Sequence, residues 1–309
     1  MFAGTGQDFD GYTGKDIKTS APRPPGSTSA NCTETRAAHV LRSIPSTLKE
    51  GHIMASTAQA IQSVPKIFKS ARTNIIRRQG PFTLHINLPG ENVPGSTDHG
   101  YGPLALIVDS ELAPGTWIRL HPHTNDEIIS WVPGGVMRHN DRTIGELLID
   151  EDHLMVMNSG AGFWHEEKTL SSDPHLRMLQ IFVRPHAADL EPEIQFGEMP
   201  KPVANRWRHL FGPVGSGAPF YVRSDVHFYD IRLDKGAEAL LPQAPSGWHV
   251  YFFVFTGLVT SDGQRFSEAE TGLIQDADGR RLQAEKESVV VAFHLNPDAK
   301  VVRLGTVGR

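Results

Sequence analysis

From Pro81 onward the chain is a succession of short β-rich runs separated by Gly, Pro, Asn or Asp, and this pattern strongly limits its fold. No segment of about 10–15 residues with helical periodicity separates the runs, which argues against a parallel sheet built from βαβ units. Two β-barrels or sandwiches in tandem are therefore expected, joined by a proline-rich linker around residues 186–212. The predicted strands are residues 104–112, 117–123, 127–132, 147–150, 154–157 and 176–183, and then 226–233, 249–259, 288–295 and 300–304.

The first 79 residues differ in character from the rest and are predicted to form an N-terminal extension. Residues 1–35 are rich in Gly, Ser, Thr and Pro and are expected to be mobile. Residues 36–79 are predicted to be partly helical, with one run before Pro45 and another over 67–76. A further hypothesis is that translation starts at Met54, which the intact mass of the native protein would test. The predicted domains are 1–79, a metal-binding barrel at 80–195 and a metal-free barrel at 196–309.

Composition excludes several classes of protein. The net charge of −5 disfavours direct binding of nucleic acid, which requires clustered Lys and Arg. No apolar run approaches the ~20 residues of a membrane helix, and the N-terminus lacks the basic and apolar regions of a secretory signal. The single cysteine, Cys32, excludes an intrachain disulfide. We therefore expect a soluble, cytoplasmic protein with no membrane association.

Two stretches place metal-ligand residue types at strand spacing. In residues 115–135, His121 and His123 are two apart, and Glu127 has the same parity. In residues 159–169, His165 and Glu167 are also two apart. Because alternate residues of a strand point to the same face, each pair is predicted to face one way. Two such strands in a small barrel could place three imidazoles and one carboxylate around a single ion.

The spacing is more informative than the individual histidines. With 15 histidines in the chain, about 0.7 His-x-His pairs are expected by chance. The wider pattern adds Gly115, Glu127 and Gly134 at fixed offsets and has a chance of roughly one in three thousand. This spacing is similar to the first motif of the cupin superfamily.

The second stretch narrows the resemblance. The run MVMNSGAGFWHEE resembles the pirin family, and His121-Pro122-His123 is similar to the pirin form of the first motif. Residues 236–263 are similar to the second cupin of pirins. The resemblance implies an all-β fold of two tandem jelly-roll-like cupin barrels with one divalent metal ion in the first. The implied ligands are His121, His123, His165 and Glu167.

The resemblance leaves the role of Glu127 open. In pirins the metal carboxylate stands at the Glu167 position, which would leave Glu127 beside the ligands. In many other cupins the carboxylate at the Glu127 position binds the ion instead. The sequence also departs from pirins at Ala161, where an Arg is usual, and at residues 151–153, where Pro-Gly-Asp is usual. Up to Arg309 it lacks the C-terminal segment that many pirins pack onto the first barrel, so we expect one pocket wall to differ.

The other candidate residues receive structural roles. Phe163, Trp164 and Trp131 are assigned to the barrel core, with stacking on a flat substrate as the alternative. His249 stands alone in the second barrel, which is therefore predicted to hold no metal. No function is assigned to the histidines that lack a partner at ligand spacing, which are His139, His153, His175, His209 and His227.

Three imidazoles and one carboxylate leave open positions on a divalent ion, as a catalytic site requires. Iron is the first choice of metal, and Mn, Ni, Co, Cu or Zn would also accept these ligands. The resemblance implies a quercetin 2,3-dioxygenase acting on a small aromatic flavonol, with Glu167 or Glu127 taking its proton. Two alternatives are a metal-dependent co-regulator that binds a protein partner and a cupin enzyme acting on another small metabolite.

Overall fold

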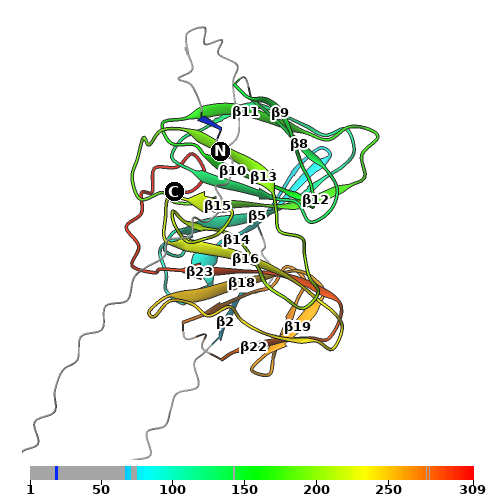
Figure 1. Ribbon diagram of the computed structural model, residues 1–309, viewed down its shortest axis with the longest axis vertical. Coiled ribbons are helices and arrows are strands. Elements are labelled where there is room, and N and C mark those ends of the chain that lie inside the picture. The colour runs from blue at the N-terminus through cyan, green and yellow to red at the C-terminus, as the bar shows by residue number, and fades with distance from the viewer. Residues whose placement is uncertain (1–17, 20–66, 71–74, 142, 276, 278) are drawn as a thin grey trace, which may run out of the picture. The chain divides into compact units, whose positions relative to one another are not determined.

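The computed structural model describes residues 18–19, 67–70, 75–141, 143–275, 277 and 279–309 (Figure 1). Its regular structure is β throughout, apart from one short 3-10 helix, η1 (Pro89–Asn92). The all-β prediction is confirmed. Within these ranges no helix is long and apolar enough to cross a membrane.

The first barrel consists of an eight-stranded sheet in the order β1-β13-β10-β7-β12-β5-β4-β3 and a four-stranded sheet in the order β6-β11-β8-β9. The strands are β1 (Lys18–Thr19), β3 (Ile75–Gln79), β4 (Phe82–Asn87), β5 (Leu104–Leu112), β6 (Trp117–His123), β7 (Glu127–Trp131), β8 (Met137–Asp141), β9 (Gly145–Ile149), β10 (His153–Asn158), β11 (Phe163–Lys168), β12 (Leu176–Val183) and β13 (Glu193–Glu198).

The second barrel repeats this plan with a seven-stranded sheet, β15-β14-β16-β23-β18-β21-β2, and a four-stranded sheet, β17-β22-β19-β20. The strands are β2 (Ile67–Ser70), β14 (Arg208–Pro213), β15 (Phe220–Val222), β16 (Val226–Leu233), β17 (Glu238–Leu240), β18 (His249–Thr256), β19 (Leu258–Ser261), β20 (Gln264–Ser267), β21 (Thr271–Ile274), β22 (Arg281–Ala284) and β23 (Ser288–Leu295).

The helical prediction for residues 67–76 is wrong. This segment contributes β2, which pairs with β21 of the second barrel, and the start of β3, which pairs with β4 of the first. Its apolar residues fit helical spacing, but pairing with a sheet edge overrides a weak local pattern. The other predicted helical run, Cys32 and Met54 lie outside the described residues.

Alternation along the strands separates three hydrophobic clusters. On β18, Val250, Phe252 and Val254 face the interior of the second barrel. The intervening Tyr251, Phe253 and Phe255 join a cluster that also contains Trp131, Leu179 and Ile181 of the first barrel. A third cluster, with Ile128, Met178 and Phe182, fills the first barrel. The two large sheets therefore pack face to face, and β18 is buried on both sides.

The residues after β23 return to the first barrel. The predicted strand at 300–304 does not form, because this segment bonds to loops and not to a sheet edge. The backbone N–H of Val302 donates to the Pro185 carbonyl (2.8 Å), and that of Thr306 donates to Thr124 (2.9 Å). The expectation that no C-terminal segment packs onto the first barrel is therefore wrong. In Figure 1 this red segment runs from β23 to the green strands.

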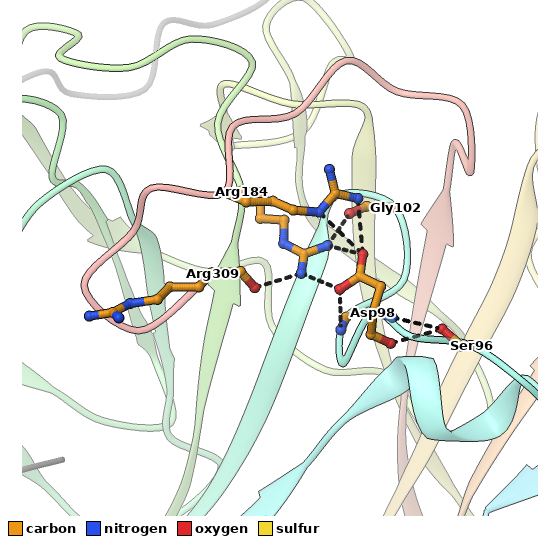
Figure 2. Close-up of polar contacts among 7 residues, drawn as sticks. Ser96, Asp98, Gly102, Arg184 and Arg309 are labelled. Atoms are coloured by element: carbon orange, nitrogen blue, oxygen red, sulfur yellow. Dashed lines mark hydrogen bonds and ion pairs between the residues drawn. The ribbon is translucent and has the colours of Figure 1, made fainter.

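Arg184, at the end of β12, anchors this returning segment. Its fully buried guanidinium donates to both carboxylate oxygens of Asp98 (2.8 and 2.6 Å) and to the Arg309 carbonyl (2.7 Å), as Figure 2 shows. Arg303 adds a further hydrogen bond to Asp98 (2.9 Å). Although burial acts to raise the pKa of Asp98, the two arginines lower it to about 2. The carboxylate therefore stays charged and holds loop and segment together.

Candidate metal centre

Strands β6 and β11 run antiparallel and bring the two predicted pairs together. His165 lies directly opposite His121, and Phe163 lies opposite His123. A β-bulge follows, because Glu167 pairs with Ile118, leaving two residues of β6 opposite one of β11. Bulges of this kind re-aim side chains beside functional sites. This one allows Ile118, His121 and His123 all to point into the barrel.

The three imidazoles converge on one point inside the first barrel. Their ring centroids are 5.1 Å apart for His121 and His123, 4.3 Å for His121 and His165, and 5.2 Å for His123 and His165. One nitrogen from each ring lies within 4.8 Å of the others. His139, His165 and Glu167 form a second group of this kind. The four predicted ligands are thus distributed over two groups that share His165.

Hydrogen bonds at Nδ1 orient two of the rings. Nδ1 of His121 lies 2.9 Å from the Arg119 carbonyl, and Nδ1 of His123 lies 3.2 Å from Oδ2 of Asp126. Because both partners only accept hydrogen bonds, each Nδ1 must carry the proton in the neutral ring. The lone pair then stands on Nε2, the nitrogen available to an ion.

His165 is oriented by a residue to which the sequence assigned no function. Its Nδ1 lies 3.1 Å from Nδ1 of His139, whose Nε2 lies 3.1 Å from Oδ2 of Asp141. Since His139 donates to the carboxylate from Nε2, its Nδ1 accepts the proton of His165. Nε2 of His165 is buried and has no hydrogen-bond partner among the described residues. The pairing of His139 with Glu167 across β8 and β11 creates this contact, and spacing within one strand could not reveal it.

Glu167 is held by a second residue that the sequence did not indicate. Nε2 of Gln180, on β12 in the opposite sheet, lies 2.8 and 2.9 Å from the two carboxylate oxygens. Gln180 shares the inward face of β12 with Met178 and Phe182. Glu167 is therefore fixed from across the barrel.

Burial favours the uncharged form of two of the imidazoles, His165 and His121. It lowers the pKa of His165 well below its ordinary value, and the neighbouring histidines act in the same direction. Burial also lowers the pKa of His121, although the nearby Glu167 carboxylate works against it. Neutral imidazoles are the form that binds metal. Together with the unpartnered Nε2 of His165, they show that the donor set fits a divalent cation.

Glu127 does not lie in this cluster. It begins β7 in the other sheet, after a turn in which Asn125 has a φ of 54°. Its Oε2 accepts from Nδ2 of Asn158 (2.5 Å) and from the backbone N–H of Arg223 in the second barrel (2.9 Å). The sequence prediction groups Glu127 with His121 and His123 because alternate residues of one strand share a face. The turn at Asn125 ends that strand before Glu127, so the grouping does not hold.

The predicted aromatic residues have three different environments. Phe163 is buried beside the cluster, 5.3 Å from His165 between ring centroids. Phe182, which the sequence did not single out, lies 6.1 Å from His123. Trp131 is in the cluster between the barrels, and Trp164 faces outward with 44% of its surface exposed. The core assignment is therefore wrong for Trp164.

The second barrel has its own group of inward-facing polar rings. Nδ1 of His227 lies 3.0 Å from Nε2 of His209, and His294 lies opposite His227 on β23. Each stands alone on its strand, so spacing could not group them. Among the described residues none belongs to a set of three donor atoms within 4.8 Å. A hollow of about 440 Å³ elsewhere on this barrel, beside Trp207 and Arg281, shares no residue with either histidine group.

Comparison with known proteins agrees with this architecture. A family model described as Pirin matches residues 74–183, and one described as Quercetinase C-terminal cupin domain matches residues 210–295. The quercetin 2,3-dioxygenase of Escherichia coli (strain K12) is 24% identical over 198 residues, which cover 64% of this chain and 84% of that protein.

Two solved structures are similar in fold. The bacterial pirin YhhW of Escherichia coli, in complex with nickel(II), is 21% identical with a TM-score of 0.64, covering 74% of this chain and 99% of that chain. The quercetin 2,3-dioxygenase of Acinetobacter baumannii is 20% identical with a TM-score of 0.62, covering 75% and 86%. The predicted fold of two tandem cupins is confirmed. The Pirin model thus matches the first barrel and the quercetinase cupin model the second, which confirms the resemblance to the pirin family found in the sequence.

Proposed function

We propose that this protein is a metal-dependent dioxygenase that opens the heterocycle of a flavonol-like substrate. The observation that supports it is the inward group of His121, His123 and His165, which shares His165 with the group that contains Glu167. Nε2 of His165 is buried and has no partner among the described residues. The names of the relatives, as quercetin 2,3-dioxygenases, suggest the substrate class. Iron remains our first choice of metal, and these ligands also suit Mn, Ni, Co, Cu or Zn.

The roles of the side chains follow from their surroundings. An ion held by the three Nε2 atoms and Glu167 would supply Lewis acidity and exchange electrons with dioxygen. Glu167 is the carboxylate at the cluster, since Glu127 faces the second barrel, and it would accept the proton of the flavonol hydroxyl. Gln180 keeps that carboxylate in place through both oxygens. The rings of Phe163 and Phe182 provide apolar surface beside His123 for a flat substrate.

The test is elemental analysis and an aerobic quercetin assay on the wild-type protein and on His165→Ala. We expect about one divalent ion per wild-type chain and turnover of quercetin, and neither in the variant. His175→Ala, which changes an exposed histidine, is the control and should behave as wild type. A wild-type protein without stoichiometric metal would refute the centre. Bound metal without turnover of any flavonol would refute only the substrate class.

A second candidate is a metal-dependent protein that binds a protein partner and does no chemistry. It has one supporting observation: Trp117 and Trp164 are 58% and 44% exposed on the strands whose inward residues form the cluster. Exposed tryptophans are common at protein interfaces. Metal-loaded protein that is inactive on flavonols, together with metal-dependent binding abolished by Trp164→Ser, would favour this candidate.

A further inference from the structure

Asp126 connects the returning C-terminal segment to a predicted metal ligand. Its side chain is fully buried in the turn between β6 and β7. One oxygen, Oδ2, lies 3.2 Å from Nδ1 of His123 and accepts the backbone N–H of Val307 (3.1 Å). The other, Oδ1, accepts the backbone N–H of Gly308 (2.8 Å). The Asp126 carboxylate thus receives backbone hydrogen bonds from residues about 180 positions later in the sequence.

The segment fits Asp126 so closely that a side chain at either of two glycines would displace the carboxylate. A Cβ atom on Gly305 would lie 2.1 Å from Oδ1 of Asp126, and one on Gly308 would lie 2.9 Å from the same atom. Between them, Thr306 donates its backbone N–H to the Thr124 carbonyl, and its hydroxyl accepts the Thr124 N–H at 2.8 Å. The backbone of residues 305–308 is therefore built around the carboxylate.

We propose that residues 305–308 are a working part of the metal centre, and that Asp126 is the positioning residue through which they act on His123. A buried carboxylate needs several N–H donors, and this segment supplies two of them. With those donors in place, Asp126 can hold the proton on Nδ1 of His123 and turn Nε2 toward the ion. This inference rests on the proposed metal centre. It adds residues 305–308, which follow the last strand of the second barrel, to the parts that the centre needs.

Loss of the segment should therefore weaken metal binding without removing a ligand. Outer partners of metal-bound histidines typically contribute about 10–100-fold to metal affinity. Deprived of the Val307 and Gly308 donors, the Asp126 carboxylate would have to turn toward other donors. That movement would release the His123 ring from its orientation.

The experiment compares Gly305→Ala, Gly308→Ala and Asp126→Asn with Gly134→Ala as a matched control. A Cβ on Gly134 would meet nothing within 4 Å, so the control makes the same chemical change without a collision. Titration of folded, metal-free protein with Ni(II) should give dissociation constants about 10–100-fold higher for the first three variants and unchanged for the control. The double variant Gly305→Ala/Asp126→Asn should bind Ni(II) no more weakly than Asp126→Asn alone. Both substitutions disrupt the same contact, the one between residues 305–308 and Asp126.

A second readout does not require metal. Nitrogen-15 NMR of the imidazole in the metal-free protein should show the His123 proton on Nδ1 in the wild type, and a mixture of tautomers in Gly308→Ala. Suppose that the wild-type protein binds Ni(II), that the variants bind it equally well, and that the His123 tautomer is unchanged. The proposed action of residues 305–308 on His123 is then overturned, while the metal centre stands. If the wild type binds no Ni(II), both are overturned. Asp126→Asn, which changes no volume, decides the matter if an alanine variant does not fold.

Discussion

Glu127 is a carboxylate that the fold removes from water, with only 1% of its surface exposed. Burial raises its pKa to about 7, against the opposing effect of Arg223 and of a hydrogen bond from Asn158. Oε1 has no hydrogen-bond partner among the described residues. The protonated form is therefore favoured in the folded protein well above the usual range for a glutamate.

Glu127 should make stability depend on pH. A carboxyl whose pKa is raised from 4.5 to about 7 on folding stabilises the protein fully below pH 4.5 and progressively less as the pH rises through 7. We expect Glu127→Gln to remove this dependence and to stabilise the protein at pH 8 by about 1–3 kcal/mol relative to wild type. Urea unfolding at pH 5 and pH 8 measures the effect.

The control for this prediction is Glu146→Gln, which changes a glutamate whose side chain is 44% exposed and paired with Lys168. It should alter the free energy of unfolding by less than about 0.5 kcal/mol at either pH. An unchanged pH dependence in Glu127→Gln would show that the buried carboxyl is not its source.

At this scale the sequence predicted the residues that share a strand and missed those that do not. His121 with His123, and His165 with Glu167, converge as expected because alternate residues of one strand share a face. His139 and Gln180 stand alone on β8 and β12, so only the order of strands in space brings them to the cluster. Asp126 could not be connected with Val307, 181 residues away, by any local pattern.

At the scale of elements, β2 shows that a segment predicted to belong to the N-terminal extension is a strand of the second barrel. Ile67 is 3% exposed and packs in the interior of the second barrel, where β2 forms the edge of the seven-stranded sheet beside β21. The next strand along the chain, β3, is the edge of the eight-stranded sheet of the first barrel. Consecutive strands thus connect the two barrels.

Replacing Ile67 should destabilise the protein although it precedes both predicted barrels. We expect Ile67→Ala to lower the free energy of unfolding by about 2–4 kcal/mol, because it leaves a cavity in a closed core. Ile76→Ala makes the same change at a residue on β3 that is 37% exposed, and should cost less than about 0.5 kcal/mol. Equal effects in chemical denaturation would mean that β2 does not contribute to the barrel.

Strands that the sequence bounds with turn-forming residues were predicted better than the others. The bounds of β5, β6, β12, β16 and β23 agree with the predicted ranges, since each lies between such residues. The predicted linker at 186–212 is interrupted by β13 and by the start of β14, each of which joins a sheet. These strands, like β2 and β3, depend on the neighbour that they pair with, which composition does not specify.

At the scale of the whole described structure, the two barrels share one core. The cluster between them draws on both large sheets, and the buried Trp131 ring packs against Phe255 and Phe228 of the second barrel. Nε1 of Trp131 donates to Oδ2 of Asp230 (3.2 Å), which Arg208 also holds. The near-continuous apolar run of β18 indicates burial on both faces, but no sequence pattern shows that the second face meets the other barrel.

A shared core predicts that both barrels unfold together. We expect a single transition in which circular dichroism and tryptophan fluorescence coincide, and a loss of about 3–5 kcal/mol in Trp131→Ala. Trp164→Ala, at an outward-facing tryptophan, should cost less than about 0.5 kcal/mol. Two separate transitions in the wild-type protein would contradict the prediction.

The return of residues 305–308 to Asp126 also has a consequence for biosynthesis. His123 and Asp126 leave the ribosome about 180 residues before Val307 and Gly308, which at about 5–20 residues per second is roughly 10–40 s. During that time every strand from β3 to β13 can already be in place, while Asp126 still lacks two of its donors. On the role proposed above, a nascent chain would hold its ion only loosely until the second barrel had been made. Tight metal binding by the first barrel would then distinguish chains translated through Gly308 from chains whose translation stopped earlier.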